Sequence, residues 1–149
     1  MKKQGWEKTL DSYIQEIANR EFKWGECDCL LFVSDACQLV CSVDPMRWKL
    51  EGDPETIRGA YSTEDEAYAF IKKYRGTTPK IMDIHFPRVK NGFQQRGDIV
   101  LQKMGRRKAF GIVWSGGKAY FKTPTPGISI HPVSDNAIVT GKQIGRAHV

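Results

Sequence analysis

The sequence has no long apolar run and no low-complexity segment. No stretch of about eighteen consecutive apolar residues occurs, and residues 1–7 contain no apolar segment that could act as a secretory signal. We therefore expect a protein that neither spans a membrane nor enters the secretory pathway through its own sequence. Internal repeats and linkers are missing as well, so the expectation is one domain over residues 1–149.

Motifs that are typical of nucleic-acid or nucleotide binding are also missing. There is no zinc-finger spacing, no ribonucleoprotein motif and no Walker loop. The net charge is +6, but the basic residues are scattered among acidic ones, apart from a cluster around Gly105 made of Lys103, Arg106, Arg107 and Lys108. This cluster is typical of a hairpin tip that could contact an acidic neighbour or a nucleic acid. We expect a solvated surface and no nucleic-acid partner.

What the chain does contain is the composition of a folded globular domain. Hydrophobic residues make up 40% and charged residues 27% of its 149 positions. A chain of this length buries about two-thirds of the surface of its unfolded form, which is enough for one compact core.

Three helices are predicted in the first half. A helix is indicated over about residues 6–19, where apolar residues recur at helical spacing. These residues are Trp6, Leu10, Tyr13, Ile14 and Ile17. Asp28 is placed to cap a second helix that is apolar nearly all round and therefore central, and that ends near Ser42 because Asp44-Pro45 cannot continue it. A capping box at residues 63–66 opens a third helix that ends at Gly76.

From Gly97 onward the pattern changes to short β-rich runs. Strands are predicted at residues 99–101, 110–114, 119–121 and 128–130, with a hairpin turn at Gly116-Gly117. Helices followed by an antiparallel sheet are typical of an α+β domain.

Cys29 is the residue that points most directly to chemistry. A cysteine one residue inside a helix start feels the positive end of the helix dipole and unpaired N–H groups, and both favour the thiolate. The neighbouring Asp28 opposes this electrostatically, although as a cap its side chain should point at the helix N–H groups. Taken by itself, a cysteine at this place is more often a small buried hydrophobic residue.

The other cysteines raise the alternative of a metal site. Cys27, Cys29, Cys37 and Cys41 fall close together, but on one helix Cys29 and Cys37 lie about 12 Å apart along the axis, too far to share one ion. Cys37 and Cys41 could chelate together only with outside ligands, for example from a partner protein. Buried small side chains are the better interpretation of this pair, and no cofactor or metal is expected.

Residues 22–32, FKWGECDCLLF, resemble the F-x-W-G-x-x-D-C-x-x-F opening of a family of small phage and prophage tail proteins. Residues 43–45, 58–61, 96–100 and 111–116 follow in the order that this family shows, so the resemblance covers nearly the whole chain. That family is similar in turn to the NlpC-type cell-wall peptidases. The resemblance implies a papain-like fold in which the Cys29 helix packs on an antiparallel C-terminal sheet.

In those peptidases a cysteine at a helix N-terminus attacks a peptide bond of peptidoglycan and is activated by a histidine from the sheet. Cys29 matches the nucleophile. The histidine normally stands two residues before the glycine that is Gly111 here, and that position holds Ala109. The third, histidine-orienting position falls near Phe121 or Lys122, neither of which is an obvious acceptor. A thiol without a positioned base loses both its activation and the proton donor for the leaving amine.

Three histidines remain as substitutes for the missing base. His85 lies in a connecting segment that could fold back over the helix start, His131 ends a predicted strand, and His148 is in the terminal tail. We take His131 as the candidate base and keep His85 as a second possibility, although a surface residue is the simpler interpretation of His85.

Trp24 and Asp28 are the candidate binding residues beside Cys29, with Trp24 as a core aromatic being the simpler interpretation. Arg58 is expected to be an internal anchor that pairs with a carboxylate.

The resemblance, together with Ala109, thus implies a structural component of a phage tail tip or baseplate, made in the host cytoplasm and carried in the virion, whose partners are other tail hub or tip proteins. The alternative is an active cysteine peptidase or amidase that opens peptidoglycan during genome entry. Fold membership does not decide between them.

Overall fold

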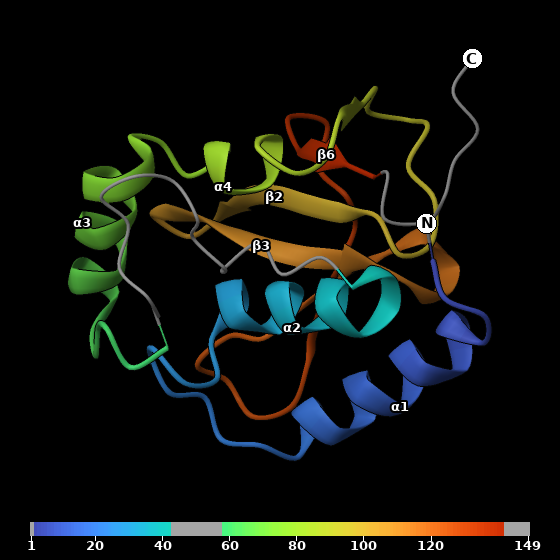
Figure 1. Ribbon diagram of the computed structural model, residues 1–149, viewed down its shortest axis with the longest axis horizontal. Helices are drawn as coiled ribbons and strands as arrows, with labels where there is room; N and C mark the ends of the chain where they lie inside the picture. The colour runs from blue at the N-terminus through green and yellow to red at the C-terminus, as the bar shows by residue number, and fades with distance from the viewer. Residues whose placement is uncertain (1, 43–57, 142–149) are drawn as a thin grey trace.

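The computed structural model describes residues 2–42 and 58–141. In these ranges the helices come first and the sheet follows (Figure 1). The elements are α1 (Trp6–Ala18), α2 (Cys29–Cys41), α3 (Glu64–Arg75), α4 (Lys80–Asp83), β1 (Arg88–Val89), β2 (Ile99–Met104), β3 (Arg107–Val113), the 3-10 turn η1 (Ser115–Gly117), β4 (Ala119–Phe121), β5 (Ser129–His131) and β6 (Ile138–Thr140). The predicted α+β class is confirmed.

The predicted helices are present with the predicted caps. The Asp28 side chain accepts a hydrogen bond from the Leu31 N–H and starts α2, and the Thr63 side chain does the same for the Glu66 N–H at the start of α3. Gly76 ends α3 with φ 84°, a left-handed value that glycine adopts readily. Residues 43–45, including the Asp44-Pro45 helix stop, lie outside the described residues. None of the helices in the described ranges is long and apolar enough to cross a membrane.

The strands form one six-stranded sheet in the order β1-β6-β2-β3-β4-β5, and every pair is antiparallel. Sequence patterns missed β1, β6 and the single-turn helix α4, because elements of two to four residues are too short to show a period. The predicted strand 128–130 is shifted by one residue in β5. Gly105 turns the hairpin between β2 and β3 with φ 71°, and Gly116 and Gly117 turn the chain between β3 and β4, as predicted.

Alternation along the strands divides the core between the two faces of the sheet. Ile99, Leu101, Phe110 and Ile112 pack with α1, α2 and α4 in the larger cluster, while Val100, Val113, Phe121 and Val139 belong to a smaller one. Helix α2 contacts both α1 and β3, and Figure 1 shows it across the centre of the molecule. Ten of its thirteen residues are buried, which confirms that this helix is central and fixes the position of Cys29 at its first turn.

Candidate functional site

A pocket of about 370 Å³ opens at the N-terminal end of α2. Its walls come from the loop before α2, the start of α3, the β2–β3 hairpin and the segment 122–131. It is lined by Phe22, Trp24, Cys29, Glu64, Tyr68, Met104, Arg107, Lys108, Ala109, Lys122, Thr123, Pro124, Thr125, Ser129 and His131. The pocket therefore brings together the candidate nucleophile, the candidate base and the alanine that stands where a base was expected.

Cys29 is the first residue of α2, and its side chain lies at the pocket wall with 8% of its surface exposed. Burial raises the pKa of the Cys29 thiol to about 12, and the charge of Asp28 raises it further, while hydrogen bonds with the backbone of Phe110 and Leu30 act in the opposite direction. The expectation that the helix start would favour a thiolate is wrong here, because desolvation outweighs the helix dipole. At neutral pH the group is a thiol.

The carboxylate of Asp28 is enclosed directly behind Cys29. It is completely buried and accepts hydrogen bonds from the Gly25 N–H at 2.8 Å, the Leu31 N–H at 2.9 Å and the Tyr61 hydroxyl at 2.9 Å. Burial, and next the charge of Asp28, raise the pKa of Tyr61, so its hydroxyl stays a donor. Asp28 is not among the residues that line this pocket, and its hydrogen bonds hold the start of the helix.

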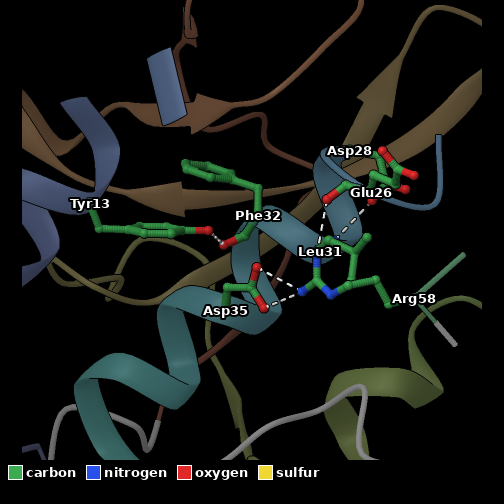
Figure 2. A network of polar contacts seen from close by, with 7 residues as sticks. All are labelled: Tyr13, Glu26, Asp28, Leu31, Phe32, Asp35 and Arg58. Atoms are coloured by element: carbon green, nitrogen blue, oxygen red, sulfur yellow. Dashed lines mark hydrogen bonds and ion pairs between the residues drawn. The ribbon is translucent and has the colours of Figure 1, made fainter. Parts of the chain in front are cut away.

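Arg58 forms a second clamp on the same helix. Its Nη2 lies 2.7 Å and 2.9 Å from the two carboxylate oxygens of Asp35, and its Nη1 donates to the Glu26 carbonyl at 3.0 Å (Figure 2). The expected pairing of Arg58 with a carboxylate is confirmed, although its side chain is 48% exposed and the anchor therefore lies at the surface. On the opposite side of α2, the Tyr13 hydroxyl donates to the Phe32 carbonyl at 2.8 Å, as Figure 2 also shows. The N-terminal half of α2 is thus held on one side by Arg58 and on the other by Tyr13 of α1.

Gly25 makes the close approach of these segments possible. Its φ is +82°, and a Cβ on this residue would lie 2.1 Å from the carbonyl oxygen of Tyr61. The Gly59 N–H in turn donates to the Gly25 carbonyl at 2.8 Å. A side chain at position 25 would therefore push the segment that carries Tyr61 away from Asp28.

The strand side of the pocket is built differently. Ala109 pairs with Gln102 in the β2–β3 ladder and contributes only a methyl group to the wall. His131 ends β5 opposite Ala119, is half-buried, and packs edge-on against Phe121 with ring centroids 5.8 Å apart. Cys29 and His131 thus line one pocket although they are far apart in the sequence.

The other two histidines are not part of this arrangement. His85 follows α4 and lies beside Phe86, with ring centroids 6.1 Å apart, and it does not line the pocket. His148 lies outside the described residues.

Trp24 is a pocket residue and not a core residue. It is half-buried, belongs to neither core cluster, and packs edge-on against Phe22 with ring centroids 4.9 Å apart. The turn closed by the bridge between Lys23 and Cys27 holds both aromatic rings at the entrance to α2. The core interpretation is therefore wrong, and the alternative interpretation of a groove-shaping residue describes its position.

Lys122, which the resemblance places near the histidine-orienting position, is a pocket residue whose burial the sequence does not indicate. Its side chain is only 1% exposed, and its ammonium donates to the carbonyl oxygens of Arg20 and Gly127. A lysine directly after a short strand normally points to solvent, so no sequence signal distinguishes this one. Its ammonium lies between the carbonyl of Arg20, shortly after α1, and that of Gly127, in the segment between β4 and β5.

Metal ligation has no support among the described residues, where no group of three or more His, Cys, Asp and Glu side chains lies close enough to hold an ion. Cys37 and Cys41 are buried in α2, and the Cys41 thiol contacts the Cys37 carbonyl oxygen at 3.1 Å. Both belong to the larger core cluster, as expected for small buried side chains.

Residues 1–139 match the family described as a domain of unknown function (DUF6950), so the chain belongs to that family. No curated protein and no solved structure matches the chain.

Proposed function

We propose that this member of the DUF6950 family is a structural component of a phage tail tip or baseplate. It is built on a catalytically degenerate papain-like, NlpC-type fold and docks between other tail hub or tip proteins without turning over a substrate. It is made in the host cytoplasm and carried in the virion. The observation that carries the proposal is the state of Cys29: a buried thiol with a pKa of about 12, beside a pocket lined by Ala109, the residue at the position where the resemblance leads us to expect the base.

The chemical argument concerns the thiolate and the proton. A group with a pKa of about 12 is ionised in only about one molecule in 10⁵ at pH 7. Without an adjacent general base the thiol is not activated, and without its conjugate acid the leaving amine receives no proton; such a group typically contributes about 10²–10⁴-fold in rate. A site with both deficits is suited to binding.

The test is made in a phage that encodes this chain, and it compares a variant that removes the thiol with a variant that disrupts the fold. Cys29→Ala virions are expected to assemble and infect normally, because the thiol performs no reaction. Leu31→Asp is expected to stop tail assembly, because Leu31 is 2% exposed in the centre of the core. Normal infectivity of the Leu31→Asp phage would contradict the scaffold function.

The second candidate is an active cysteine peptidase or amidase that cleaves peptidoglycan with His131 as its base. The observation in its favour is that His131 and Cys29 line the same pocket. Purified sacculi would be incubated with the wild type, Cys29→Ala and His131→Ala, and released muropeptides read by mass spectrometry. Release by the wild type that both variants abolish would establish this function; no release from folded wild-type protein would exclude it for the purified chain.

A further inference from the structure

The pocket contains a buried cation whose charge no acidic side chain of the described residues neutralises. The two hydrogen bonds of the Lys122 ammonium go to backbone carbonyls, and none of the ion pairs formed within residues 2–42 and 58–141 includes it. An ammonium group has three donors, so one remains for the pocket. Because burying a charge is costly unless it is paired, an anion in the pocket would stabilise Lys122.

The other charged groups of the pocket do not supply that anion. Glu64 is the one carboxylate among the lining residues, and its oxygen lies 3.6 Å from Nε of Arg107. Arg107 is further held by Asp65 at 2.7 Å and by the ring of Tyr68 at 4.5 Å. Lys108 is also on the wall, and because Arg107 is paired with both Glu64 and Asp65, Lys108 and Lys122 are the lining cations without an ion pair among the described residues. The pocket is therefore complementary to a negatively charged group.

Three hydroxyl groups lie on the same wall as Lys122. The Thr123 oxygen is 2.8 Å from the oxygens of both Thr125 and Ser129, which are themselves 3.1 Å apart. Hydroxyl protons rotate, so these groups can turn from one another towards an incoming oxygen atom. A buried ammonium beside a cluster of hydroxyls is a suitable receptor for a carboxylate.

The shape of the site suits an extended chain. β5 is the last strand at its end of the sheet, so one edge of it has no neighbouring strand in the described sheet. Its residues Ser129 and His131 line the pocket, while Ile130 between them is 50% exposed. Edge strands bind extended peptides by adding a strand, and alternate side chains then enter pockets. The rings of Phe22 and Trp24 offer an apolar wall for a neighbouring side chain.

We infer that the pocket at the head of α2 receives a carboxylate side chain from an extended acidic segment of a partner protein, paired to Lys122 and aligned along β5. This inference rests on the proposed function, since it supplies the chemistry of the docking partner. The residues that would have served catalysis thus form a receptor: the methyl of Ala109 leaves room, and the ammonium of Lys122 supplies the charge.

The experiment uses two fluorescein-labelled pentapeptides, Glu-Phe-Glu-Phe-Glu and Lys-Phe-Lys-Phe-Lys, with binding to the full chain followed by anisotropy. The acidic peptide is expected to bind and the basic one not. Lys122→Met should weaken binding by at least about tenfold, and Lys122→Arg should retain most of it. Lys118→Met is the matched control, because Lys118 is exposed and outside the pocket, and should leave binding unchanged.

Several outcomes would overturn the inference. These are equal binding of both peptides, unchanged binding by folded Lys122→Met, and tighter binding of free succinate or of an oligothymidylate than of the acidic peptide. If circular dichroism shows that Lys122→Met does not fold, the Thr125→Val/Ser129→Ala variant decides: binding weakened by about threefold or more supports the inference, and unchanged binding overturns it. Muropeptide release by the same preparation would contradict the proposed function. The peptide-binding measurement tests the acidic partner and is interpreted independently of that result.

Discussion

The two walls of the pocket are built by opposite means. On the helix wall, the polar groups around Cys29 are satisfied within the protein: the Asp28 carboxylate has three donors, and Arg58 is paired with Asp35. On the strand wall, Lys122 has only carbonyl partners, the hydroxyls contact one another, and Ala109 is apolar. The groups of the helix wall are used to hold the protein together, whereas the ammonium and hydroxyl groups of the strand wall are the ones that can bind a ligand. The difference teaches that two walls of one pocket can differ in how far their polar groups are already satisfied, which leaves the strand wall as the side with groups to offer a ligand.

The largest expected effect breaks the helix wall. Asp28→Ala removes a helix cap and leaves the Gly25 N–H and the Tyr61 hydroxyl as buried donors without their acceptor. We expect the free energy of unfolding to fall by about 3–5 kcal/mol, measured by urea denaturation. Thr63→Ala is the control, because it removes an exposed cap of α3 and should cost only about 1 kcal/mol. If both variants lose the same free energy of unfolding, the hydrogen bonds of Asp28 to Gly25 and Tyr61 do not stabilise the protein beyond the helix cap.

A second pair of variants sharpens the same comparison through backbone geometry. Gly25 and Gly59 have nearly equal φ values, +82° and +79°, but only Gly25 has a backbone atom within reach of a new Cβ. Gly59→Ala should cost about 1 kcal/mol for the left-handed conformation alone. Gly25→Ala adds the clash with the Tyr61 carbonyl and should cost about 3 kcal/mol. Thermal unfolding of both variants measures the difference, and equal melting temperatures would refute the close approach.

The smallest expected effect concerns the buried thiol. The pKa of Cys29 is about 12 in the folded chain, above its ordinary value of about 9. Its contribution to stability is complete below about pH 8.5. Above that pH the unfolded chain releases the proton while the folded chain keeps it, so stability falls by up to about 1.4 kcal/mol per pH unit from this group until about pH 12.

Urea denaturation of the wild type and Cys29→Ala at pH 7.5, 9 and 10 measures this effect. The alanine variant lacks the titrating group, so its stability should fall less steeply with pH, and the tyrosines and Cys27 cancel in the comparison. If the stability of both proteins falls equally with pH, the Cys29 thiol is not buried as the structure shows. Solvent would then reach the helix wall of the pocket.

The local features of the fold were predictable from the sequence, and the site was predictable only in part. Asp28 and Thr63 were recognised as caps because a cap acts on N–H groups two or three residues away. Cys29 and His131 were named from sequence and lie in one pocket. The sequence does not predict that Trp24 lines the pocket, because burial of an aromatic residue depends on packing partners distant in the chain.

The sequence by itself determined where α1, α2 and α3 begin and end, the hairpin turns at Gly105 and Gly116-Gly117, and the position of Cys29 in the first turn of α2. Periodicity, caps and turn residues act over a few positions, so a linear pattern contains them. Only the tertiary structure decided that Cys29 is a thiol, that Tyr61 closes over Asp28, and that Lys122 is a buried cation beside His131. Desolvation and charge pairing depend on everything that surrounds a group in space, and segments from four parts of the chain meet at this pocket.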